Sequence, residues 1–156
     1  KLLFDMGYPV LALLTGPARG YVKTKLKDYG IPFVHKYPSN HNDLKSFYHA
    51  LDIYLITSRE EGGPMGLLES AACGTTVVST DVGMAKDLII DGYTGFLVDK
   101  IEVQELARKV EYFINLKSEE KNLLQKNARK AVCRFDWSIV AKEHWEKVYK
   151  PLITAH

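Results

Sequence analysis

Four apolar runs, each followed by a segment of helical character, constrain the fold of this chain more than any other feature. They are 10–14 (VLALL), 52–57 (DIYLIT), 76–80 (TVVST) and 94–98 (TGFLV), with a shorter run at 32–35. A continuously apolar run is typical of a strand that is buried on both faces of a sheet. Strands that alternate with helices predict a parallel sheet with right-handed crossovers. We therefore predict an α/β fold, a Rossmann-like parallel sheet with helices on both faces.

Helical periodicity dominates the remainder of the chain. Apolar residues recur on one helix face over 103–116, a second helical run covers 118–134, and a third begins at 136–138. We expect a helical C-terminal segment in which Trp137 and Trp145 make core contacts. A length of 156 residues is that of one domain, so we treat 1–156 as a single unit.

Composition narrows the class of protein. Hydrophobic residues make up 46% of the chain, and the net charge of +2 comes from intermixed acidic and basic residues, which argues against a nucleic-acid binder. No apolar run approaches the length of a membrane span, and no signal-peptide pattern is present. Cys73 and Cys133 lack metal-ligand spacing. A cytoplasmic setting is the resulting prediction.

The stretch 58–81 (SREEGGPMGLLESAACGTTVVSTD) carries the chemistry that we consider functional. It predicts the end of a strand, a glycine-rich turn, a helix that stops at Gly74, and another strand. Gly62 and Gly63 let a ligand approach the backbone closely, and Pro64 suits the start of a helix. In parallel sheets, ligands bind beyond the carboxyl ends of the strands, which is where this turn is expected.

The helix start predicts an anion site flanked by two carboxylates. Free amides of Met65, Gly66 and Leu67 would face outward at the positive end of the helix dipole. Glu61 precedes the helix, Glu69 lies about one and a half turns into it, and each carboxylate suits vicinal hydroxyls. Together these groups suit a nucleotide sugar. The alternative is a turn with no ligand, because glutamates near a helix start also favour the dipole.

Three motifs in a fixed order resemble a known family. E-x7-E, then SAACGTTVVSTDVG, then DLIIDGYTGFLVD resemble the C-terminal domain of glycosyltransferase family 4, the group 1 glycosyltransferases with the two-domain GT-B fold. Residues 43–52 and 135–149 and the turn at 14–17 are similar to the family as well. The resemblance implies that 1–156 is the nucleotide-sugar-binding half of a GT-B enzyme. The first strand and the N-terminal acceptor domain would then be missing from this chain.

The resemblance also implies an activity. It is the metal-independent, retaining transfer of a hexose, mannosyl- or glucosyl-like, from a GDP-, UDP- or ADP-sugar to an acceptor hydroxyl in polysaccharide, lipopolysaccharide or glycolipid synthesis. No cofactor and no metal are expected. The sugar or lipid-linked acceptor would bind through the missing N-terminal domain, so the fragment alone would be inactive. Peripheral membrane association is left open.

Carried over by position, the resemblance assigns the reaction-centre contact with the donor sugar to Glu61 and the ribose contact to Glu69. The full donor-binding set is Gly16, His35, Tyr37, Gly62, Gly63, Met65, Gly66, Leu67 and Glu69. Within it, the base would lie against 35–37. The chain departs from the pattern at Gly63 and Pro64, where many members have an aromatic residue and a glycine. Arg19 follows a different turn from the phosphate-binding cations of the family, so we assign it no such role.

A second class of function stays open at this point. The same residues would serve a non-catalytic nucleotide- or phosphate-binding Rossmann-like module. A phosphorylatable regulatory domain is disfavoured, because 10–16 lacks the acidic cluster that such a domain requires.

Overall fold

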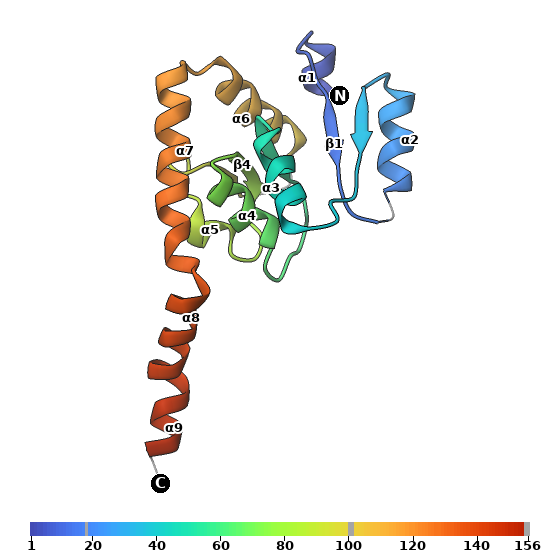
Figure 1. Cartoon of the computed structure of the whole chain (residues 1–156). Coiled ribbons are helices and arrows are strands. Elements are labelled where there is room, and N and C mark those ends of the chain that lie inside the picture. Colours follow the sequence, from blue (N-terminus) through green and yellow to red (C-terminus); the bar gives the residue numbers. More distant parts are fainter. Residues whose placement is uncertain (18, 100–101, 155–156) are drawn as a thin grey trace.

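The computed structural model describes residues 1–17, 19–99 and 102–154 (Figure 1). Its strands are β1 (Ala12–Leu14), β2 (Phe33–His35), β3 (Ile53–Ile56), β4 (Thr76–Thr80) and β5 (Phe96–Val98). Its helices are α1 (Leu2–Asp5), α2 (Gly20–Asp28), α3 (His41–His49), α4 (Met65–Cys73), α5 (Ala85–Leu88), α6 (Val103–Asn115), α7 (Ser118–Val132), the 3-10 turn η1 (Cys133–Phe135), α8 (Trp137–His144), the π-helical η2 (Trp145–Tyr149) and α9 (Lys150–Thr154). Strands alternate with helices up to β5, and helices follow, as the sequence predicted.

The strands form two parallel sheets. β3, β4 and β5 make one sheet with β4 in the centre, where Val78 lies opposite Phe96. β1 and β2 make the other, where Leu13 lies opposite Val34. The parallel pairing confirms the α/β prediction, but one continuous sheet was expected. The structure differs because no strand of the described residues pairs with both β1 and β3, and sequence periodicity does not identify the neighbours of a strand.

Helices cover both faces of the three-stranded sheet. Every residue of β4 is buried, and its successive side chains point to opposite faces. Val77 packs into a cluster with Leu67 of α4 and with residues of α5 and α7. Val78 packs into a second cluster with Leu106 and Phe113 of α6. Since both faces are apolar and covered, this sheet forms the main core of the molecule.

Helix α4 is held at its C-terminal end. Gly74 follows the helix with φ of +77°, in the left-handed region that favours glycine. A Cβ at this position would also lie only 2.5 Å from Nη2 of Arg129. That guanidinium belongs to α7 and donates a hydrogen bond of 3.0 Å to the carbonyl of Cys73. The predicted end of the helix at Gly74 is therefore confirmed, and a cation lies at the negative end of its dipole.

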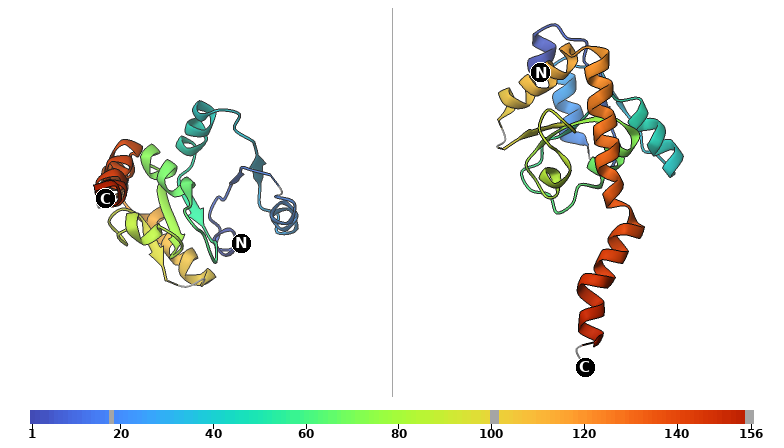
Figure 2. Two further views of the ribbon diagram at one scale, coloured as in Figure 1. Left: turned by 90° about the horizontal axis from the view of Figure 1, so that it is seen from below. Right: turned by 90° about the vertical axis from the view of Figure 1, so that its left-hand side faces the viewer.

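The C-terminal helices extend away from the rest of the molecule (Figures 1 and 2). None of their residues from 137 to 154 is buried. The prediction that Trp137 and Trp145 make core contacts is wrong, since they are 75% and 50% exposed. The reason is a break in the helix: the Asp136 carboxylate accepts a 2.9 Å bond from the Ser138 amide and starts α8 in a new direction. No helix in the described ranges is long and apolar enough to cross a membrane.

Candidate functional site

The glycine-rich turn connects β3 to α4 at the carboxyl end of the three-stranded sheet. Pro64 is the N-cap of α4 and provides no side-chain cap. Over the described residues, the amides of Met65 and Gly66 donate to no protein oxygen, as the first amides of a helix generally do not. The Leu67 amide instead donates to the Pro64 carbonyl at 2.9 Å. The prediction of a free Leu67 amide is therefore wrong, because the tight first turn of α4 uses this amide. The amides of Met65 and Gly66 remain as the two free donors.

The turn leaves its backbone accessible. Gly62 and Gly63 are exposed, and a Cβ built on either would have no atom within 4 Å. A ligand could therefore approach the chain here, as the sequence predicted for these two glycines.

Glu61 is held at the edge of this turn by Ser58 of its own loop, which is itself bonded to β4. The Ser58 hydroxyl donates to Oε1 of Glu61 at 2.7 Å, and the Ser58 carbonyl accepts a 2.8 Å bond from Thr80. Gly83, with φ of +52°, lies so close that its Cβ would be 2.8 Å from the Glu61 carbonyl. The Glu61 side chain is exposed, so its carboxylate is oriented and available to solvent or ligand.

Glu69 is oriented by a buried tyrosine. The hydroxyl of Tyr48, on α3, donates to Oε2 of Glu69 at 2.8 Å. Tyr48 is only 5% exposed. Burial, followed by the hydrogen bond to Glu69, raises the pKa of Tyr48 well above its ordinary value. The phenol therefore stays protonated and acts as a donor to the carboxylate.

Tyr54, on β3, reaches the start of α4, where its hydroxyl oxygen lies 2.3 Å from the position of a Cβ built on Gly66. Burial raises the pKa of Tyr54, and the negative charges of Glu69 and Glu61 raise it further, whereas the positive charge of Arg19 lowers it. The charges of Glu61, Glu69 and Arg19 therefore all act on one phenol whose hydroxyl lies against Gly66 at the start of α4. Sequence analysis assigned Arg19 no phosphate-binding role, so it missed that the charge of this residue acts on Tyr54.

The segment predicted to contact the base, 35–37, begins at the last residue of β2, and the donor-binding candidate Gly16 follows β1. Nε2 of His35 is 2.9 Å from the carbonyl oxygen of Gly16, whose φ is +83°. Tyr37 is 70% exposed. The structure thus brings Gly16 and His35 together beside the two-stranded sheet. The ring of Tyr37 stays exposed to solvent.

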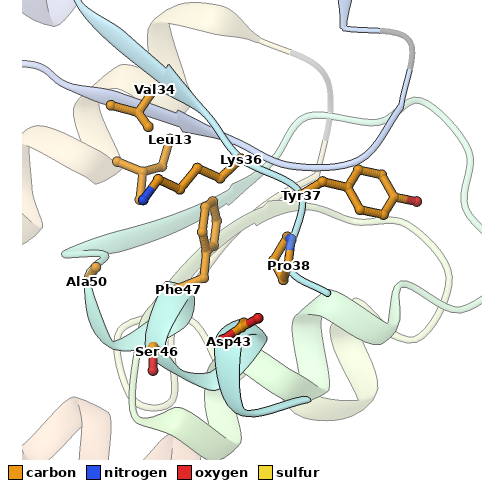
Figure 3. Close-up of a pocket in the computed structure, with 9 residues that line it drawn as sticks. All are labelled: Leu13, Val34, Lys36, Tyr37, Pro38, Asp43, Ser46, Phe47 and Ala50. Atoms are coloured by element: carbon orange, nitrogen blue, oxygen red, sulfur yellow. The ribbon is translucent and has the colours of Figure 1, made fainter. Parts of the chain in front are cut away.

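A cavity of about 550 Å³ separates β1 and β2 from α3 (Figure 3). Its lining is Leu13, Val34, Lys36, Tyr37, Pro38, Asp43, Ser46, Phe47 and Ala50. Phe47 points from α3 toward Leu13, whereas the Tyr37 ring points away from it. Neither Glu61 nor Glu69 lines this cavity, so Tyr37 and these two carboxylates are not part of one pocket.

Sequence reasoning missed the roles of Tyr48 and Tyr54. A tyrosine in a buried strand such as 53–56 needs a partner for its hydroxyl, and that need was the available signal. As to metals, no group of three or more His, Cys, Asp or Glu in the described ranges is arranged to hold an ion. Metal independence itself stays a prediction.

Comparison with known proteins identifies relatives. The model of the family described as "Glycosyl transferases group 1" matches residues 5–131. The chain is 31% identical over 104 residues to the D-inositol 3-phosphate glycosyltransferase of Streptosporangium roseum, covering 67% of this chain and 24% of that protein. It is 26% identical to the capsular polysaccharide biosynthesis glycosyltransferase CapM of Staphylococcus aureus, covering 92% and 38%. It therefore spans only about a quarter to two fifths of the length of these relatives.

A solved structure agrees with these relatives. Anabaena HepE in complex with UDP-glucose superimposes with a TM-score of 0.75 at 26% identity, over 90% of this chain and 41% of that one. The fold is that of one half of a GT-B glycosyltransferase. Because the family model covers most of the chain, this protein belongs to the group 1 glycosyltransferases.

Proposed function

We propose that this chain binds the nucleoside-diphosphate sugar of a glycosyltransferase. The observation that carries the proposal is the pair of unpartnered amides, Met65 and Gly66, at the start of α4, in the same region as the carboxylates of Glu61 and Glu69. Amides at a helix start suit a diphosphate, and carboxylates suit sugar hydroxyls. The likeness to HepE, whose structure contains UDP-glucose, supports a uridine donor.

The proposed reaction is retaining, metal-independent hexosyl transfer. Negative charge develops on the leaving diphosphate as the glycosidic bond breaks, and its stabilisation is the main electrostatic task. In our proposal the α4 dipole and the amides of Met65 and Gly66 perform this task, with Arg19 close by. Glu61 holds hydroxyls of the donor hexose, mannosyl- or glucosyl-like, and Glu69 holds the ribose.

The acceptor side of the reaction lies outside this chain in the proposal. The matched residues cover only 24% and 38% of these relatives, which supports a further N-terminal domain that binds a sugar or lipid-linked acceptor. CapM is named for capsular polysaccharide biosynthesis, and this supports an acceptor in polysaccharide or glycolipid synthesis. Such an enzyme would work in the cytoplasm, with peripheral association at the membrane that carries a lipid-linked acceptor.

Titration calorimetry of the full-length protein with UDP, GDP and ADP tests the proposal. We expect one of the three nucleotides to bind. Glu69→Ala should lower the affinity for this nucleotide at least about tenfold, because a hydrogen bond to a charged group is lost. Glu61→Ala should mainly slow transfer, since free UDP has no hexose for this carboxylate to hold. Glu111→Ala, a glutamate that pairs with Tyr8, is the matched control and should bind normally. Failure of all three nucleotides to bind would contradict the proposal, and binding without transfer would favour the non-catalytic module.

A further inference from the structure

Tyr48 lies beneath the start of α4, where three elements meet. Its ring packs edge-to-face against Tyr54 of β3, with centroids 5.5 Å apart and planes at 75°. Its backbone carbonyl accepts a 2.8 Å bond from the buried Thr75 hydroxyl. Because ring and backbone are both fixed, the direction of the hydroxyl group is set by the fold.

Gly66 provides the space that the two phenols occupy. A Cβ at Gly66 would lie 2.3 Å from the Tyr54 hydroxyl oxygen and 3.2 Å from that of Tyr48. The first is far inside van der Waals contact, so any larger residue would force the Tyr54 phenol to shift. Both hydroxyls therefore lie against the helix turn whose Gly66 amide is free.

The contact leaves half of the Glu69 carboxylate available. Oε2 accepts from Tyr48, and Oε1 accepts no hydrogen bond within the described residues. Glu69 is half-buried, so its side chain still reaches solvent. A long glutamate side chain that is already held in one rotamer loses less conformational entropy when a ligand binds.

We infer that Tyr48 is a positioning residue for ribose recognition: its hydroxyl holds Oε2 of Glu69 and thereby aims Oε1 at a ribose hydroxyl. The inference rests on the proposed function, because it requires that Glu69 contact the ribose. It goes further in assigning the precision of that contact to a residue of α3, which does not touch the ligand.

The test compares two ligands on the full-length protein. UDP carries both ribose hydroxyls, and 2′,3′-dideoxy-UDP carries neither. The wild-type protein should bind UDP more tightly. Tyr48→Phe should weaken the binding of UDP about tenfold, which is the loss typical of a charge-assisted hydrogen bond. The same substitution should weaken the binding of the dideoxy ligand by less than about twofold. In a Glu69→Gln background, Tyr48→Phe should change the ligand preference much less, because the carboxylate that it orients is gone.

Tyr8→Phe is the matched control. Tyr8 also donates to a glutamate, Oε1 of Glu111 at 3.0 Å, but on α6. This variant should keep the wild-type affinity for both ligands. Thermal unfolding of each variant shows whether it is folded, and Tyr48→Phe retains the ring contact with Tyr54 and the backbone bond to Thr75.

Each failure has a distinct meaning. If the wild-type protein bound none of the nucleotides, or bound UDP and its dideoxy analogue equally, the proposed role of Glu69 would fall and this inference with it. If the wild-type protein preferred UDP and Tyr48→Phe kept that preference, only the inference would be overturned. An equal loss of both ligands in Tyr48→Phe would show a structural role and overturn it as well.

Discussion

The two sheets of this molecule differ in how completely they are packed. The central strand of the three-stranded sheet, β4, is buried along its whole length, with an apolar cluster on each face. The two-stranded sheet has no buried residue in β1 or β2 and borders an open cavity. Two paired strands are marginal without further packing, whereas three strands covered by helices form a core. Glu61, Glu69 and the free amides at the start of α4 lie next to the well-packed sheet. The other predicted donor-binding residues lie in or next to the strands of the two-stranded sheet: Gly16, His35 and Tyr37.

The largest expected effect compares one phenylalanine in each sheet. Phe96 of β5 is 1% exposed, and Phe96→Ala should lower the free energy of unfolding by about 3–5 kcal/mol. Phe33 of β2 is half-buried, and Phe33→Ala should cost less than about half as much, because less apolar area returns to water. Urea unfolding followed by circular dichroism measures both values. Equal losses would mean that the two sheets are equally packed in solution.

A pair of glycines sharpens the same comparison within one loop. Gly66→Ala should destabilise the fold by about 1–3 kcal/mol, because its Cβ would overlap the Tyr54 hydroxyl. Gly62→Ala should stay within about 0.5 kcal/mol of the wild-type protein, since the space around it is open. Thermal melts of the two variants measure the difference. A neutral Gly66→Ala would show that the phenols move aside at little cost.

The pH dependence of stability tests the buried side of the site. Tyr48 faces Tyr54, Glu69 and Cys73, and its raised pKa means that the folded state keeps a proton that the unfolded chain releases above about pH 10. Stability contributed by this group is complete below that pH and falls above it, by up to about 1.4 kcal/mol per pH unit. Tyr48→Phe should show a shallower loss. Urea midpoints measured between about pH 9 and pH 11 decide this, and identical slopes would contradict it.

The smallest effect is expected on the exposed strand. Val34→Thr on β2 should change stability by less than about 0.5 kcal/mol, because that side chain is 38% exposed. Val78→Thr on β4 places a hydroxyl in a fully buried position and should cost about 1–3 kcal/mol. If Val34→Thr and Val78→Thr lowered the free energy of unfolding in urea equally, Val34 would be buried in solution and not exposed.

Local features were predictable from the sequence, and long-range ones were not. Apolar runs and the glycine after Cys73 identified the strands and the end of α4, because these depend on neighbouring residues. The contact of Tyr48 with Glu69 spans 21 positions and joins two helices, so no local pattern marks it. The same holds for the division into two sheets and for the exposed Trp137, which depend on how distant segments meet.

The guanidinium of Arg129 at the far end of α4 has a consequence for ligand binding. The nine residues of this helix separate Arg129 from the free amides by roughly 13 Å. The Arg129 bond holds one end of the helix, and the buried side chains of Leu67 and Ser70 pack the turns that follow its start, so α4 is anchored along its length. In the proposed reaction, the leaving diphosphate would therefore meet an electric field that is already oriented, and its stabilisation would require little movement of the helix when the bond breaks.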